Sequence, residues 1–383
     1  MISLIRKRNG GPMKKSILSI AGIFLITSLF FAGVINEDKP IQGKWDFKMV
    51  KLWEVDKAGE DYFVSMSVYS DEDGKVFITD SKNFKTYVFD KSGKFLLSFG
   101  ERGEGPGEMK QFGSLYIVND KLIYYENHKV HYFSKEGTYH ESANIPQDLV
   151  PRAFIDEESL ISAPRMNWRD PKGEAECVIY DIKDKSKTLL FEYSTYKKGV
   201  ARRTSARSRS SFSFSSSDIT PLMITAYRDN KIYYGINNEY KITVRDLKTG
   251  KEFDFGLKRE KQAVPKEFKD DLLKGINFPA DVKKQIKDGL PDHFTFFEGM
   301  LIDGKGNIYV FVTDALAENR RKIDIFSPDG KYIYSAEVRV EKDLIIRSSD
   351  YNNDKLYLGI EDEAENMKLV KYKIAVPEIS LNK

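Results

Sequence analysis

The chain has 383 residues, of which 41% are hydrophobic and 31% are charged, a composition typical of soluble globular proteins. Its formal net charge of +3 is too small to indicate nucleic acid or an anionic membrane surface as a partner. The single cysteine, Cys177, excludes an internal disulfide, so the fold must depend on its hydrophobic core.

The N-terminus carries the features of an export segment. A basic stretch that includes Met13 precedes an apolar run over residues 17–34. This order is typical of a secretory signal peptide. We therefore assign residues 1–36 to a signal peptide cut near Ala32 or, as the alternative, to an uncleaved membrane anchor. Both interpretations predict an exported protein, in the periplasm or cell envelope or secreted.

Six segments of similar pattern follow. Each contains short runs rich in β-branched and aromatic residues, separated by polar turns, which predicts strands. The copies span residues 71–100, 118–142, 156–194, 227–256, 302–338 and 351–374. Radially repeated units of this kind are the signature of a β-propeller. We predict an all-β, six-bladed propeller over residues 37–383, in which the strand-like segment 44–56 completes the last blade and closes the ring.

The first and fifth copies show a more specific likeness. The stretches "GKVFITDSKNFKTYVFDKSGKFLLSFGERGEGPGEM", which begins at Gly74, and "GKGNIYVFVTDALAENRRKIDIFSPDGKYI", which begins at Gly304, look like NHL-type repeats. Over residues 44–376 the chain resembles the exported six-bladed β-propeller proteins of bacteria. This resemblance implies the same fold and the same export.

The glycine-rich stretch "SFGERGEGPGEMKQF", residues 98–112, raises the question of phosphate binding. It lacks the lysine and hydroxyl that follow the last glycine of a Walker loop. We interpret it as the turn from the outer strand of one blade to the inner strand of the next, where glycine supplies positive φ. The alternative is a ligand role for Arg102 and Glu108 at the mouth of the central channel.

Two insertions interrupt the repeats. Residues 197–218 are rich in serine and arginine, which favours a flexible solvated loop. The second insertion, residues 260–299, contains one or two short helices at 3.6-residue spacing and is interpreted as a helical cap. We expect such a cap to cover apolar surface or to wall a pocket with His293, Phe294 and Phe296.

No H-E-x-x-H or G-x-S-x-G motif occurs, and we predict no metal, no cofactor and no catalytic residue. The favoured function is a non-catalytic binding propeller, a monomer that recognises a protein, peptide or glycan at the channel mouth, without nucleic acid. Membrane contact would come only through an uncleaved anchor. The alternative is a lyase or hydrolase with a metal or polar site in the central channel. The candidate ligand-binding residues, in predicted loops at blade junctions or in the cap, are Arg102, Glu108, Arg165, Trp168 and His293.

Overall fold

The computed structural model describes residues 33–164, 173–194, 200–205, 208–213, 218–274, 276–314, 320–339, 345–352 and 354–375. Within these ranges all elements but two are strands. Residues 1–32, which hold most of the predicted export segment, lie outside them. No helix within the described ranges is both long and apolar enough to cross a membrane.

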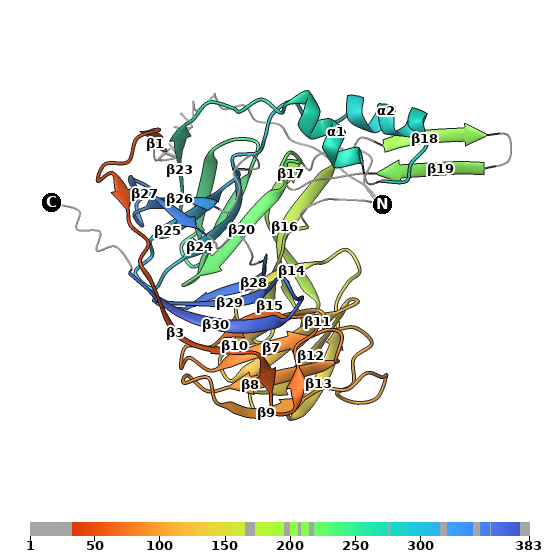
Figure 1. Ribbon diagram of the computed structural model, residues 1–383, viewed down its shortest axis with the longest axis vertical. Coiled ribbons are helices and arrows are strands. Elements are labelled where there is room, and N and C mark those ends of the chain that lie inside the picture. The colour runs from red at the N-terminus through yellow and green to blue at the C-terminus, as the bar shows by residue number, and fades with distance from the viewer. Residues whose placement is uncertain are drawn as a thin grey trace, which may run out of the picture. The chain divides into compact units, whose positions relative to one another are not determined.

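Six antiparallel sheets form the blades of a β-propeller, one for each predicted copy (Figure 1). Blade 1 contains β6 (Ser67–Ser70), β7 (Val76–Asp80), β8 (Lys85–Phe89) and β9 (Phe95–Phe99). Blade 2 contains β10 (Ser114–Val118), β11 (Lys121–Glu126), β12 (Lys129–Ser134) and β13 (Tyr139–Asn144). Blade 3 contains β14 (Pro151–Phe154), β15 (Ser159–Ser162), β16 (Glu174–Asp181) and β17 (Ser186–Ser194). Blade 4 contains β20 (Met223–Arg228), β21 (Lys231–Ile236), β22 (Lys241–Asp246) and β23 (Glu252–Lys258). Blade 5 contains β24 (Phe297–Ile302), β25 (Ile308–Val312), β26 (Arg320–Phe326) and β27 (Tyr332–Arg339). Blade 6 contains β28 (Ile345–Asn352), β29 (Lys355–Glu361), β30 (Met367–Ile374) and β3 (Met49–Val55). The prediction of an all-β, six-bladed propeller is confirmed.

The local sequence explains why these strands form. In blade 1 every residue of β7 is buried, and β7 consists almost wholly of β-branched and aromatic residues, which fit a strand packed on both faces. Its preceding turn is stabilised by Asp71, whose Oδ1 accepts a hydrogen bond from the Lys75 amide at 2.9 Å. Gly74 has a φ of +84°, which glycine adopts without strain. The Asp-rich turns therefore separate the strands, as the sequence predicts.

The N-terminal segment adds strands to three successive blades. We call residues 34–55 the strap. Its strand β1 (Val34–Glu37) pairs in parallel with β23, and β2 (Lys44–Trp45) pairs in parallel with β27. Strand β3 then pairs antiparallel with β30 and supplies the outer strand of blade 6, so the predicted ring closure is present. Residues 34–36, which the predicted export segment includes, lie in β1.

The hydrophobic core is continuous across five of the six blade junctions. One cluster joins blades 4 and 5, for example, and includes Tyr240, Phe255 and Phe326. Comparable clusters join blades 1 and 2, 2 and 3, 3 and 4, and 6 and 1. Within the described residues, blades 5 and 6 instead carry two separate small clusters. Propeller blades gain stability from burial against their neighbours, so this junction holds less shared apolar contact than the others.

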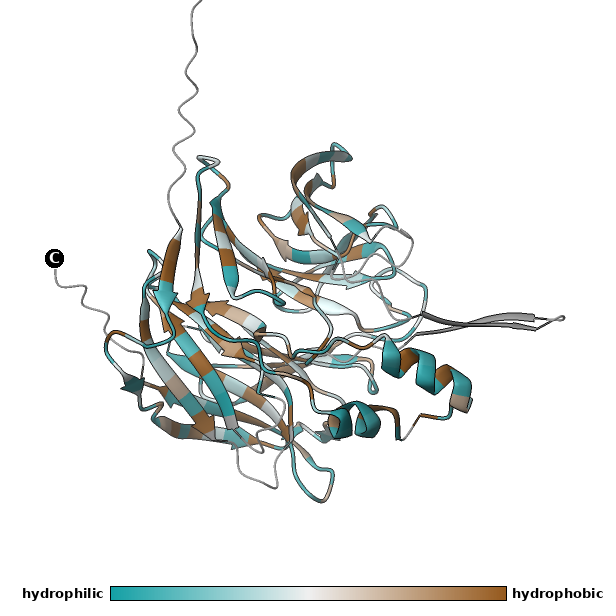
Figure 2. Ribbon diagram, turned by 90° about the horizontal axis from the view of Figure 1, so that it is seen from above, coloured by the Kyte–Doolittle hydropathy of each residue, from teal (hydrophilic) through white to brown (hydrophobic). Residues whose placement is uncertain are grey.

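The insertions have their own structure. The predicted helical cap contains α1 (Lys266–Lys274) and α2 (Ala280–Asp288), whose outward faces are mostly hydrophilic in Figure 2. Their apolar faces pack on a separate cluster that includes Leu273, Ile286 and Phe294. The segment predicted as a serine- and arginine-rich loop contains the hairpin β18 (Val200–Ser205) and β19 (Ser208–Ser213), so the structure differs from a plain loop there. A further short hairpin, β4 (Lys57–Ala58) and β5 (Asp61–Tyr62), precedes blade 1.

Candidate functional site

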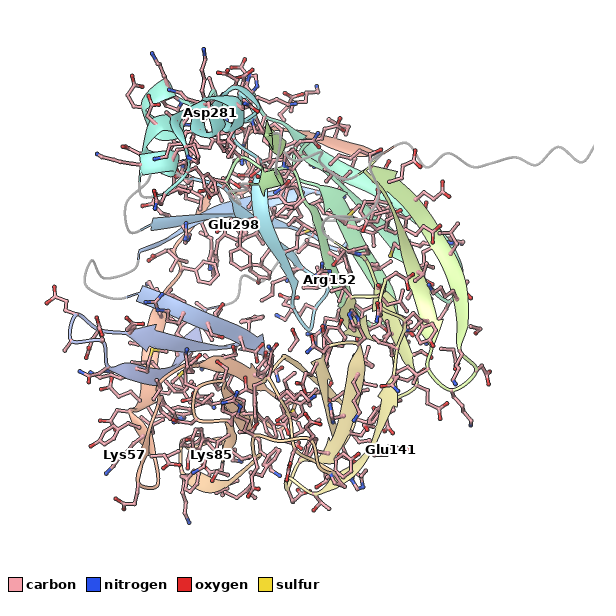
Figure 3. The ribbon with its side chains drawn as sticks, turned by 90° about the vertical axis from the view of Figure 1, so that its right-hand side faces the viewer. Lys57, Lys85, Glu141, Arg152, Asp281 and Glu298 are labelled. Carbon is pink, nitrogen blue, oxygen red and sulfur yellow. The ribbon has the colours of Figure 1, made fainter. Side chains whose placement is uncertain are left out.

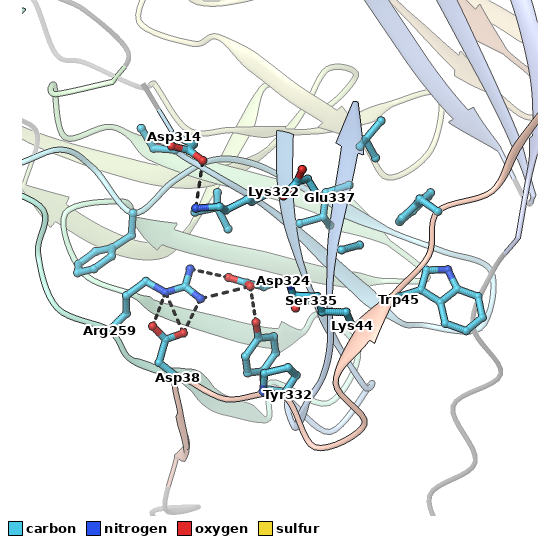
Figure 4. Close-up of a pocket in the computed structure, with 18 of the residues that line it drawn as sticks. Asp38, Lys44, Trp45, Arg259, Asp314, Lys322, Asp324, Tyr332, Ser335 and Glu337 are labelled. Atoms are coloured by element: carbon cyan, nitrogen blue, oxygen red, sulfur yellow. Dashed lines mark hydrogen bonds and ion pairs between the residues drawn. The ribbon is translucent and has the colours of Figure 1, made fainter. Parts of the chain in front are cut away.

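A pocket of about 1000 Å³ lies between blade 5, the strap and the base of the helical insertion (Figure 4). Its walls come from the strap over residues 38–49, from residues 259–262 and 294–296 at the two ends of the insertion, and from β25, β26 and β27. Trp45 and Phe47, which line it, belong to the blade 5 cluster that is separate from blade 6. Phe296 and Tyr332, which also line it, belong to the cluster that joins blades 4 and 5, so the pocket borders the core of blade 5 on both sides.

Arg259, which follows β23, is held between two carboxylates on one wall of the pocket. Its Nε and Nη2 donate to Asp38 of the strap at 2.5 to 3.0 Å, and its Nη1 donates to Asp324 Oδ2 of β26 at 2.8 Å. Burial opposes the charged guanidinium, but the hydrogen bonds to Asp38 and the charge of Asp324 outweigh it and raise the pKa of Arg259. Arg259 is therefore a permanent cation whose hydrogen bonds go to carboxylates of the protein itself.

Asp324 also accepts two phenolic hydrogen bonds. The hydroxyls of Tyr240 and Tyr332 donate to its carboxylate at 2.5 and 2.6 Å. Burial, and then the neighbouring Asp324 charge, raises the pKa of both phenols, so both remain protonated donors. Five side chains, Arg259, Asp38, Asp324, Tyr240 and Tyr332, thus satisfy one another, and the network joins the strap to blades 4 and 5.

The base of the helical insertion forms the second wall. The amide of Phe294 donates to the Gln262 carbonyl at 2.9 Å, which brings the two ends of the insertion together. The hydroxyls of Thr295 and Thr313 are hydrogen-bonded at 3.0 Å. Thr313, which follows β25, and Lys322 of β26 both line the pocket. Phe294 and Phe296 line the pocket, as the sequence predicts for a pocket beside the cap.

The strap contributes the aromatic wall. The indole nitrogen of Trp45 donates to the Ala375 carbonyl at 3.1 Å, and its ring lies 5.2 Å from that of Tyr334. Phe47 packs edge-on to Tyr309 at 6.5 Å. These contacts fix both rings, so they offer a rigid apolar surface that costs little entropy when a ligand covers it.

The pocket is acidic. Six carboxylates face three cationic side chains, which gives the lining a formal charge of −3. Lys322 Nζ lies 3.1 Å from Asp314 Oδ2, and Arg259 is shared between two carboxylates. Asp46 and Glu260 are exposed members of this set. A partly enclosed acidic cleft concentrates the field on a bound ligand, so positively charged groups are favoured there.

Arg102 and Glu108 lie on one loop, where they serve its own structure. Glu108 Oε2 accepts a hydrogen bond from the Gly105 amide at 2.9 Å, and a Cβ at Gly103 would lie 1.8 Å from the same oxygen. Arg102 is exposed and lies over the Phe84 ring at 5.0 Å. Neither residue lines the large pocket. A ligand role for this pair stays a prediction.

The other candidates do not gather into one site. His293 is exposed, pairs with Ala263 in an isolated bridge at the neck of the insertion, and does not line the pocket beside Phe294 and Phe296. Arg165 and Trp168 lie outside the described residues. Sequence reasoning missed Arg259, Asp324 and Asp38, because no local motif marks residues that meet only through the fold. Among the missed residues of the pocket lining, Trp45 was the one that the sequence could have indicated, but its segment, residues 44–56, was interpreted only as the strand that closes the ring.

Within the described ranges, no group of three or more His, Cys, Asp or Glu side chains is arranged to hold a metal ion. A catalytic site in the central channel stays a prediction.

Figure 3 shows Arg152 of β14 toward the middle of the blades and Lys57, Lys85 and Glu141 on their outer surface.

The comparisons define the class of protein. The family model DUF5128, described as a 6-bladed beta-propeller, matches residues 61–274, and the chain belongs to this family. No curated protein matches the sequence. A member of the DUF4221 family from Bacteroides vulgatus has a similar solved structure, with 11% identity, a TM-score of 0.55 and coverage of 87% of this chain and 99% of that one. A predicted exported protein of Bacteroides fragilis is similar too, with 12% identity, a TM-score of 0.51 and coverage of 86% and 95%. At these identities the likeness shows the fold alone.

Proposed function

We propose that this protein is an exported binding propeller that holds a segment of a protein, peptide or glycan in the pocket between the strap, the insertion and blade 5. The observation that carries the proposal is a pocket of about 1000 Å³ with fixed aromatic and charged walls. Ligand sites are concave, largely apolar and equipped with a few oriented polar groups, and their volumes reach about 1000 Å³.

The chemistry of the walls supports binding by side-chain contact. Trp45, Phe47 and Phe296 offer apolar surface, and buried aromatic anchors dominate the energy of most recognition sites. Arg259 and its partners form a satisfied network, which keeps this wall rigid without needing the ligand. A preformed site loses little free energy to ordering when its ligand binds.

Export is supported by where the fold begins. The predicted apolar run ends at Val34, and β1 begins at the same residue. Cleavage after Ala32 would leave the whole strap in the mature protein, ready to pair with β23. We therefore favour a cleaved signal peptide and a monomer in the periplasm or cell envelope, or secreted. N-terminal sequencing of the exported protein tests this: a mature start near Gly33 supports it, and a retained Met13 contradicts it.

A pocket-filling variant tests the binding site. Ser335 lines the pocket from β27, so Ser335→Phe should occupy the space that the ligand needs. Ser186→Phe, on the exposed face of outer strand β17, is the matched control. A panel of short peptides and oligosaccharides is screened by thermal unfolding, since a ligand of the folded state raises Tm. We expect at least one compound to raise the Tm of the wild type and of Ser186→Phe but not of Ser335→Phe. Equal shifts in all three proteins would place the site elsewhere.

A further inference from the structure

We infer that the ligand of the pocket is a basic polypeptide segment in which lysine or arginine side chains alternate with apolar ones. The inference rests on the proposed function and adds the chemical class of the ligand. It follows from the charge of the lining, from which of those charges remain exposed, and from the aromatic surface beside them.

Two of the three positive charges of the pocket lining are already paired. Arg259 lies between Asp38 and Asp324, and its side chain is 20% exposed. Lys322 lies 3.1 Å from Asp314 and opposite Glu337 in the register of β26 and β27. With these two cations engaged by carboxylates, a phosphate, sulfate or carboxylate on a ligand would find only Lys44 as a further cation of the lining.

The pocket lining contains more carboxylates than its own cationic side chains can neutralise. Asp46 on the strap and Glu260 at the start of the insertion are exposed and lie on separate segments of the wall. Two carboxylates on separate segments suit two cationic side chains of one extended chain. A like-charged ligand would be repelled by the same field.

The aromatic wall suits the same ligand. Trp45 precedes Asp46 directly, and both line the pocket. A lysine or arginine stem can lie along the indole while its charged end reaches the carboxylate, and Trp is the best aromatic partner for a cation. Figure 4 shows Trp45 and Arg259 on opposite sides of the view, with Lys322, Asp324 and Glu337 between them, so the aromatic wall and the ion network are separate parts of the lining.

The test uses three probes and isothermal titration calorimetry on the purified protein. The probes are a five-residue peptide of alternating lysine and leucine, its glutamate and leucine counterpart, and a neutral oligosaccharide. The pocket variant Asp46→Asn/Glu260→Gln is compared with Asp120→Asn/Glu141→Gln, which removes the same charges from exposed positions of blade 2. Exposed ion pairs contribute about two- to fivefold each in affinity.

We expect saturable binding of the lysine peptide, weakened about tenfold by the pocket variant and by less than twofold in the blade 2 variant. Binding should also weaken as salt rises. No binding of the lysine peptide, or equal weakening by both variants, would overturn the inference. If the neutral oligosaccharide binds instead and Ser335→Phe abolishes that binding, the proposed function stands and the basic ligand is wrong. If a probe binds and Ser335→Phe has no effect, the proposed function itself fails.

Discussion

Arg259 donates hydrogen bonds from Nε and Nη2 to the carboxylate of Asp38, a residue 221 positions earlier in the chain. This contact fastens the strap to the end of blade 4, and the same guanidinium reaches Asp324 of blade 5. The strap in turn supplies the aromatic wall of the pocket. One arginine thus links ring closure, two blades and the candidate site.

Replacing Arg259 should destabilise the protein more than its position at a surface pocket suggests. Arg259→Met leaves Asp324, whose side chain is 4% exposed, without its counter-charge. Breaking a buried ion pair in this way costs about 3 kcal/mol. Lys258→Met is the control, because Lys258 pairs with Glu37 on the same strap but in an exposed position, where a pair contributes about 1 kcal/mol or less. Urea unfolding of both variants measures the difference; equal losses would contradict the role given to Arg259.

His131 should make the protein sensitive to acid. The ring is buried in β12, and burial lowers its pKa to about 4, although the buried Glu126 carboxylate lies 3.6 Å from its Nε2 and favours the charged ring. The unfolded chain binds this proton near pH 6.5, so the unfolded state takes up more protons between pH 6.5 and 4 and the free energy of unfolding falls as the pH falls. The loss should approach about 1.4 kcal/mol per pH unit.

His131→Phe should remove this part of the acid sensitivity, whereas His140→Gln, at an exposed position of β13, should keep it. Urea unfolding at pH 7, 6 and 5 gives the comparison. A slope in His131→Phe as steep as in the wild type would mean that other groups carry the acid sensitivity.

Blade 6 and blade 1 are joined by a contact that a single methyl group should disturb. Trp53 of β3 packs over the β8–β9 turn, and a Cβ on Gly93 would lie 2.9 Å from a Trp53 ring carbon. Gly250 occupies the equivalent β22–β23 turn, also with positive φ, but a Cβ there meets no atom within 4 Å. Both Gly→Ala variants bear the cost of positive φ, about 1 kcal/mol.

Gly93→Ala should therefore lose more stability than Gly250→Ala, and it should also change the fluorescence of Trp53. Thermal unfolding and emission spectra together separate the two effects. Equal losses with unchanged emission would show that Trp53 does not hold this junction.

The blades were predictable because each strand is specified locally. Short apolar runs such as Val76–Asp80, set between Asp- and Gly-containing turns, indicate strands without any knowledge of their neighbours. Ring closure was predictable for the same reason, since the last copy lacked a fourth strand and residues 44–56 had a strand pattern. The NHL-like character of the repeats stays a prediction.

The site was not predictable, because its residues meet only across long separations. Asn36 fixes β1 through Gly256 and Tyr332, which lie 220 and 296 positions away, and β2 is only two residues long. Neither leaves a pattern in a single sequence. Conversely, the charged residues that stand out in the glycine-rich loop include Glu108, whose carboxylate is bound by the loop's own Gly105 amide.

Protection of an engineered cysteine tests the central claim most directly. Cys177 is buried, and burial raises the pKa of its thiol to about 12, so the native protein should not react with a maleimide. In Ser335→Cys, Arg102→Cys and His293→Cys the new thiol is labelled with and without a compound that raises Tm. We predict that the ligand slows labelling at position 335 at least tenfold and leaves positions 102 and 293 unchanged. Protection at position 102 or 293, with none at 335, would contradict the claim that the pocket between the strap and blade 5 holds the ligand.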